Sequence, residues 1–324
     1  MTDNMANDIA DDDPLALAAA WRADGHDVAL ATVVATWGSS PRPPGSQLVV
    51  RGDGVHRGSV SGGCIEGAVI EEALAVMADG SARLLRYGVT DERAWEVGLS
   101  CGGTVEVHVA RPPDVLDQLL ADRAARRPVA LLTNLETGDT ELVHDHQALD
   151  EDRSRLAEGV FVQVHNPPPR LIIVGAVHIS QPLIRIAELA GYAVILVDPR
   201  SAFTGGDRFP GLTVIGEWPD DALAALKLDD RCAVVTLTHD PKLDDPALCV
   251  ALRSPAFYIG CLGSRRTHAK RLERLAGLGF GEAERGRLHG PVGLHIGASS
   301  PAEIALSIMA EITQVRRAAA RSGT

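Results

Sequence analysis

The second half of the sequence alternates fully apolar runs with helical stretches, and this order limits the fold more than any other feature. The apolar runs cover residues 171–174, 193–197, 212–215, 233–237 and 257–260. The helical stretches cover residues 179–190, 220–226, 246–252 and 265–276, followed by a long helix over 301–317. Strands that are apolar at every position are buried on both faces, and helices between them make the strands parallel. The sequence therefore predicts a Rossmann-like, doubly wound domain built on a parallel sheet.

The first half has a different, mixed α/β pattern. Strands are predicted over residues 28–36, 47–51, 55–57, 83–87, 104–110 and 129–134, and helices over 15–22, 65–78 and 115–125. Between the halves lies the proline-rich segment 165–170, which we expect to join neither a sheet ladder nor a helix. The predicted organisation is a disordered acidic tail over 1–14, an N-terminal domain over 15–165, a linker over 166–170 and a C-terminal Rossmann-like domain over 171–324.

Composition argues against several classes of protein. The 324 residues carry a formal net charge of −12, which disfavours nucleic acid or an anionic membrane as the main partner but still allows a local basic pocket for a small anion. No apolar run approaches the ~20 residues of a membrane-spanning helix. The acidic tail has no lysine or arginine for a secretory signal. Five cysteines at scattered spacings do not form a disulfide framework, so we expect a reducing cytoplasm and a chemical role for any special cysteine.

The turn after the first parallel strand stands where a dinucleotide fingerprint would be. Gly175 opens the turn and His178 closes it, while Asp198 and Arg200 follow the second strand. An acid about 20 residues after the glycine would meet a ribose hydroxyl. However, Val177 replaces the glycine that lets the backbone approach a pyrophosphate, which argues against tight NAD(P) binding. A helix start at His178 can still hold an anion, and a plain strand-to-helix turn is the alternative.

Two glycine-flanked cysteines in the first half are the strongest chemical signal. The first segment reads Ser61, Gly62, Gly63, Cys64, Ile65 and Glu66 and leads into a predicted helix. The second reads Ser100, Cys101, Gly102 and Gly103 and precedes a predicted strand. Glycines let the backbone approach a ligand, unpaired N–H groups at a helix start stabilise a thiolate, and a thiolate binds metal or accepts sulfur. The alternative is that each cysteine is a small buried side chain and that Glu66 only favours the helix dipole.

Three further sites could hold an anion or move a proton. Arg42 lies in a rigid proline-rich loop, and its guanidinium is a good fork for phosphate. Gly263, Ser264 and Arg265 begin a helix after a strand, where an anion would be stabilised. His239 follows another strand and could serve as a base or a ligand, because ligands gather at the carboxyl ends of such strands. For each site the alternative is an ordinary surface arginine or loop histidine.

As an ordered set, these segments resemble the XdhC/CoxI family of accessory proteins for xanthine dehydrogenase and related molybdenum hydroxylases. The resemblance runs from about residue 15 to residue 317. The segments that carry it cover residues 38–45, 61–66, 101–103, 169–175, 198–200, 238–240, 260–266 and 291–294. Val177 departs from the pattern, because the family often has glycine at that position.

The resemblance implies a maturation factor, not a metabolic enzyme, that binds the molybdenum cofactor (molybdopterin) transiently. Such a factor protects the cofactor while an oxo ligand is exchanged for a sulfido ligand, with a cysteine desulfurase as the sulfur source. It then delivers the cofactor to the apoenzyme of a molybdenum hydroxylase. By this resemblance Cys64 and Cys101 line the metal end of the cofactor, while Arg42 and the glycine-flanked helix starts suit its phosphate. A homodimer is also implied.

Two other functions stay open from the sequence. An NAD(P)-dependent oxidoreductase would have His239 or Asp240 near the nicotinamide, and Val177→Gly would then improve its affinity for the nucleotide. A protein–protein adaptor would dock the apoenzyme without holding cofactor, and its complexes would persist after both cysteines are lost. We rank the cofactor chaperone first, the adaptor second and the dehydrogenase third.

Overall fold

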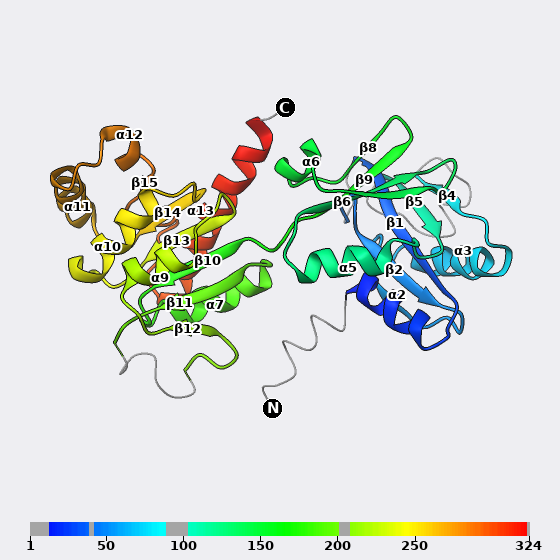
Figure 1. Ribbon diagram of the computed structural model, residues 1–324, viewed down its shortest axis with the longest axis horizontal. Coiled ribbons are helices and arrows are strands. Elements are labelled where there is room, and N and C mark those ends of the chain that lie inside the picture. Colours follow the sequence, from blue (N-terminus) through cyan, green and yellow to red (C-terminus); the bar gives the residue numbers. More distant parts are fainter. Residues whose placement is uncertain (1–12, 39–41, 89–102, 201–207, 323–324) are drawn as a thin grey trace. The chain divides into compact units, whose positions relative to one another are not determined.

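The chain divides into two compact units, Met1–Pro167 and Pro168–Thr324 (Figure 1). The computed structural model describes residues 13–38, 42–88, 103–200 and 208–322. Most of the predicted acidic tail therefore lies outside the described residues. Each unit contains its own buried clusters of aliphatic side chains, and each is described by itself below.

The first unit contains a five-stranded antiparallel sheet in the order β3-β2-β1-β5-β4. Its strands are β1 Val28–Trp37, β2 Gln47–Arg51, β3 His56–Gly58, β4 Arg83–Tyr87 and β5 Thr104–Ala110. Helix α3, Glu66–Asp79, packs on one face of this sheet through Val69, Ala73 and Val76. The alternation of buried and less buried residues along β5 gives this sheet two distinct faces.

A second, four-stranded sheet in the order β7-β6-β9-β8 completes the first unit. Its strands are β6 Val129–Asn134, β7 Thr140–Val143, β8 Arg155–Ala157 and β9 Val160–His165. Helices α2 (Pro14–Ala23) and α5 (Leu116–Ala124) share a core with β1, β2 and β6, and the short α6 (Gln147–Asp150) packs against β6 and β9. Of these strands only β6 was predicted from the sequence. Strands β7 and β8 are short and polar, whereas the apolar alternation of β9 was a signal that was missed.

The second unit is built on a parallel sheet in the order β12-β11-β10-β13-β14-β15. Its strands are β10 Arg170–Val174, β11 Ala193–Val197, β12 Thr213–Ile215, β13 Cys232–Thr236, β14 Tyr258–Cys261 and β15 Leu288–His289. Its helices are α7 Ser180–Leu189, α9 Pro219–Ala225, α10 Pro241–Leu252, α11 Arg265–Gly277, α12 Glu282–Arg285 and α13 Pro301–Ser322. This is the strand order of the Rossmann fold. The predicted fold class, mixed α/β followed by a Rossmann-like domain, is confirmed.

Both faces of the parallel sheet are covered, which explains why its strands are apolar at every position. Leu171 and Ile173 of β10 face a core that includes α7 and α13. Ile172 and Val174 face the opposite core, formed with α9, α10 and α11. Within the described ranges, no helix is both long enough and apolar enough to cross a membrane.

Two predicted boundaries are wrong, each for a local reason. His165 pairs with Val129, and Arg170 pairs with both neighbouring strands, so the proline-rich segment lies outside the strands only over residues 166–169. Helix α10 begins at Pro241 and not near residue 246. Asp240 caps it by accepting a 2.9 Å hydrogen bond from the Lys242 amide.

Candidate functional site

The turn after β10 and the loop after β13 touch each other at the carboxyl edge of the parallel sheet. Gly175 has a φ of +115°, and a Cβ there would lie 2.6 Å from Thr238 Cγ2. A side chain would therefore be strained by the backbone angle and would overlap Thr238. Strand order reverses between β10 and β13, and ligands of open α/β sheets bind where it does.

Asp198 lies at the end of β11, and its carboxylate is already engaged. One oxygen accepts a 2.7 Å hydrogen bond from the Ala176 amide, and Arg200 donates to both oxygens through Nε and Nη2. Burial alone would raise the pKa of Asp198, but the hydrogen bonds from Arg200 and Ala176 lower it overall. Asp198 thus holds the turn after β10 in place through its hydrogen bond with the Ala176 amide.

The predicted helix start at His178 is wrong, because α7 begins at Ser180. The Ser180 hydroxyl donates to the Gly175 carbonyl oxygen at 2.5 Å and accepts from the Val177 amide at 3.1 Å. These bonds close a tight turn before the helix. His178 is an exposed residue of that turn, two positions before the helix starts.

A pocket of about 240 Å³ brings the end of β13 together with α10 and α11. It is lined by His239, Pro241, Asp244, Arg266, Thr267, Lys270, Arg271 and Arg274. Gly263 has a φ of +142°, and a Cβ there would lie 3.2 Å from Thr267 and 3.8 Å from His239 Nδ1. Two predicted regions, His239 and the loop around Gly263, are therefore neighbours at this pocket.

The other two residues predicted beside Gly263 have different surroundings. Ser264 caps α11 by accepting a 3.1 Å hydrogen bond from the Thr267 amide. Arg265 is exposed, and neither residue is among those that line the pocket. His239 has a φ of +61°, which is uncommon for a residue with a side chain and often marks functional positions.

The loop before α3 turns its hydrogen-bond donors onto Glu66. Its carboxylate accepts hydrogen bonds from the Ser59 and Ser61 hydroxyls and from the amides of residues 60–63. Burial alone would raise the pKa of Glu66, but these bonds, led by those from Ser61 and Ser59, lower it to about 2. We expected the amides of Gly62 and Gly63 to be unpaired. Instead, an internal carboxylate occupies their donors.

Cys64 lies in this loop, and Arg42 lies next to it. The Cys64 side chain is a free, half-buried thiol that packs beside the core between α3 and the five-stranded sheet. The exposed Arg42 donates through Nε to the Ser59 carbonyl oxygen at 3.2 Å. The fold therefore brings Arg42 next to the segment that carries Cys64, although 22 positions separate them.

The second cysteine motif is only partly described. Cys101 and Gly102 lie outside the described residues. Gly103 is buried immediately before β5, whose first residue, Thr104, pairs with Trp37 at the end of β1. Among the described residues, no group of three or more His, Cys, Asp or Glu side chains could hold a metal ion.

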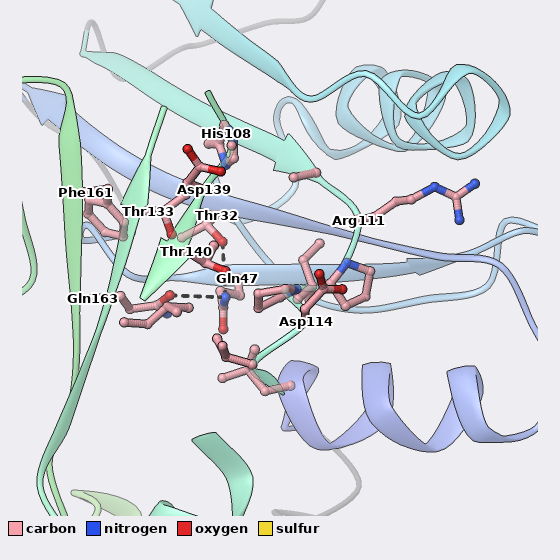
Figure 2. A pocket seen from close by; sticks show the side chains of 18 of the residues that line it. Thr32, Gln47, His108, Arg111, Asp114, Thr133, Asp139, Thr140, Phe161 and Gln163 are labelled. Carbon is pink, nitrogen blue, oxygen red and sulfur yellow. Dashed lines mark hydrogen bonds between the residues drawn. The ribbon is translucent and has the colours of Figure 1, made fainter. Parts of the chain in front are cut away.

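A polar cavity of about 370 Å³, not predicted from the sequence, lies between the two sheets of the first unit (Figure 2). Gln47 Nε2 donates to Thr32 Oγ1 at 3.1 Å and to Gln163 Oε1 at 3.5 Å. His108 is 7% exposed, and its Nε2 atom has no hydrogen-bond partner among the described residues. The available signal was a polar residue within otherwise apolar strand sequence, as at Thr32, His108 and Gln163.

His108 is expected to make the first unit sensitive to mild acid. Burial lowers the pKa of His108 below its ordinary value of 6.5, so the folded state favours the uncharged ring. The stabilising contribution of the uncharged His108 ring is therefore fully present above pH 6.5 and is lost as pH falls through the lowered pKa. Thermal unfolding of the intact chain at about pH 7.5 and about pH 5.5 should show a smaller loss for His108→Gln than for the unchanged protein. His56→Gln, which changes an exposed histidine, is the control and should lose as much as the unchanged protein. An equal fall in unfolding temperature for His108→Gln and the unchanged protein would contradict this assignment.

The comparisons with known proteins agree with the fold. Residues 21–88 match a family model described as the XdhC and CoxI family, and residues 171–312 match one described as the XdhC Rossmann domain. The Escherichia coli protein PaoD, named as a molybdenum cofactor insertion chaperone, is 32% identical over 295 residues, covering 90% of this chain and 84% of PaoD. The chain belongs to the XdhC and CoxI family. The resemblance noted in the sequence is confirmed.

Two further relatives span almost the same length as this XdhC/CoxI protein. A Bacillus subtilis protein, named as a probable subunit of xanthine dehydrogenase, is 30% identical, covering 91% of this chain and 94% of the relative. A crystal structure described as a xanthine dehydrogenase from Bacillus halodurans has a TM-score of 0.77 and 27% identity, covering 94% and 96% of the two chains. The likeness therefore includes both units.

The predicted site residues fall into two groups, one in each unit. In the first unit, Arg42 lies close to the loop that contains residues 61–65. Gly103 immediately precedes β5 of the five-stranded sheet on which α3 packs. In the second unit, Gly175, Asp198, Arg200, His239 and Gly263 lie along the carboxyl edge of the parallel sheet.

Proposed function

We propose that this XdhC/CoxI protein binds the molybdenum cofactor and inserts it into a xanthine dehydrogenase-type enzyme. The observation that carries the proposal is the 32% identity with PaoD, named as a molybdenum cofactor insertion chaperone, over 90% of this chain. The match to a protein named as a probable subunit of xanthine dehydrogenase supports the class of client. The chain acts before catalysis, as a maturation factor.

The Cys64 thiol is the side chain we assign to the metal end of the cofactor, together with Cys101. It is free and half-buried, beside a loop whose own donors are occupied by Glu66. A thiolate is a soft ligand for molybdenum or an acceptor of sulfur. Arg42, exposed beside the same loop, presents a cationic fork. When bound, the cofactor would supply the molybdenum centre at which sulfuration takes place.

The finer parts of the proposal concern partners. A cysteine desulfurase supplies the sulfur, the apoenzyme of a molybdenum hydroxylase receives the cofactor, and the chain works in the cytoplasm as a homodimer. The cofactor is held transiently, and NAD(P) has no role. Val177 in the turn after β10 and the engaged carboxylate of Asp198 both favour a ligand other than a dinucleotide.

The function is tested by cofactor retention and delivery. The intact chain is purified after co-expression with the cofactor pathway, its bound pterin is measured by fluorescence after gel filtration, and it is then mixed with client apoenzyme. Cys64→Ala should lose at least about tenfold in retention and delivery, because removing even a group that only orients a metal ligand typically costs this much. Cys249→Ala is the control, because Cys249 is a free thiol on α10 of the second unit.

Three results would contradict the proposal, and each points to a different alternative. Full retention and delivery by a Cys64→Ala, Cys101→Ala protein would remove the cysteines from the site. Client binding without pterin, unaffected by either substitution, would indicate an adaptor. Tight NADH binding without pterin would indicate an oxidoreductase.

A further inference from the structure

We propose that the pocket between α10 and α11 binds the phosphate group of a small ligand, with Arg271 at its base and Arg266 and Lys270 at its rim. The two helices contact each other on one face of the parallel sheet (Figure 1). The pocket lies beside the loop after β13, at the edge where ligands of open α/β sheets gather.

Arg271 is a buried cation with unused donors. It is 1% exposed, and its Nη2 atom donates to the Leu262 carbonyl oxygen at 3.0 Å. Its Nε and Nη1 atoms have no hydrogen-bond partner among the described residues. Leaving a buried guanidinium donor without an acceptor costs free energy, and Arg271 lines the pocket. An acceptor that enters the pocket would satisfy them.

The nearest carboxylate only partly compensates this charge. Asp244 Oδ2 lies 3.5 Å from Arg271 Nη2, beyond a good charge-assisted hydrogen bond, and it has no hydrogen-bond partner among the described residues. The other oxygen, Oδ1, accepts a 2.6 Å hydrogen bond from the Thr238 hydroxyl. Burial also raises the pKa of Asp244, which disfavours its charged form. The base of the pocket therefore stays electropositive.

The rim adds further positive charge. Arg266 and Lys270 are exposed and form no ion pair with any described residue, whereas Arg274 is held by Asp245 through bonds of 2.5 and 2.9 Å. Arg266, Lys270 and Arg274 are four positions apart, so they project from the same side of α11. Unpaired cations gathered at one pocket, in a chain of net charge −12, fit a small multivalent anion.

The charges in the first turn of α11 are unfavourable for the helix itself. The first turn of α11 contains no acidic residue and begins with two arginines, although the positive end of the helix dipole favours acids there. A phosphate at this end would be stabilised by the dipole, the arginine forks and the Thr267 hydroxyl together. Helix stability therefore does not account for the arrangement, and anion binding does.

The site is tested with inorganic phosphate and pyrophosphate by calorimetry on the intact chain, at constant ionic strength. Arg266→Gln, Lys270→Gln should weaken binding of at least one probe by about tenfold or more, because two charge-assisted contacts are lost. Arg185→Gln on α7, an exposed arginine that does not line the pocket, should bind as the unchanged protein does. Arg271→Lys keeps the buried charge but loses the fork, and should weaken binding to a similar extent.

Absence of millimolar or tighter binding of either probe would overturn the proposal, as would equal binding by the unchanged and doubly substituted proteins. The phosphate site is argued from the residues of the second unit alone and does not rest on the proposed function. If the double variant loses phosphate binding but retains pterin at the unchanged level, the site stands and its ligand is another phosphate ester. If pterin is never retained but phosphate binds through these residues, only the proposed function fails.

Discussion

Gly175→Ala is expected to lower the free energy of unfolding of the second unit by about 3 kcal/mol. The new methyl group would lie 2.6 Å from Thr238 Cγ2, at a backbone φ of +115°. The two costs are separate: the backbone angle strains any residue with a Cβ, and the overlap pushes the turn after β10 away from the loop after β13. Urea denaturation followed by circular dichroism measures the loss.

A matched control separates these costs. Gly191 has a φ of +80° with nothing within 4 Å of a Cβ, so Gly191→Ala should show only the backbone cost, about 1 kcal/mol. Thr238→Ser removes the overlapping methyl and keeps the hydroxyl that donates to Asp244. When Thr238→Ser is combined with Gly175→Ala, a double-mutant cycle should show that about 1–2 kcal/mol of the lost free energy of unfolding is recovered. Strict additivity would show that the two loops do not touch as described.

Glu66→Gln is expected to destabilise the first unit by about 2 kcal/mol at neutral pH, a value reduced for its partial exposure to solvent. A glutamine amide has one oxygen to accept the donors of residues 59–63, and its NH₂ group would face amides that also donate. Glu71→Gln is the control, because Glu71 is an exposed residue of the same helix. Urea denaturation gives the free energy of unfolding of the unchanged, Glu66→Gln and Glu71→Gln proteins for this comparison.

The same substitution predicts a pH dependence. Hydrogen bonds lower the pKa of Glu66 from 4.5 to about 2 in the folded state, so its stabilising effect is fully present above pH 4.5 and is lost as pH falls towards 2. The difference between the unchanged and Glu66→Gln proteins should therefore shrink between neutral pH and about pH 3. A difference that does not change over this range would mean that the charge of Glu66 is not what holds the loop.

Elements with strong periodicity could be predicted, and those that depend on partners could not. The apolar runs of β10, β11 and β13 were recognisable because burial on both faces leaves no polar position. Strands β7 and β8 are stabilised by pairing with β6 and β9, so their short segments carry little local signal. Helix α10 was predicted too short, since its start depends on the cap formed by Asp240.

The sequence by itself determined the family, the fold class and the residue types available for chemistry, because motif order and hydrophobic period are properties of the chain. Only the tertiary structure decided how those residues are used. It turned the loop amides onto Glu66, engaged Asp198 with Arg200, and buried Arg271 with unpaired donors beside Asp244. Each of these outcomes depends on which polar atoms the packing does or does not bring within about 3 Å of one another, the distance over which a hydrogen bond forms.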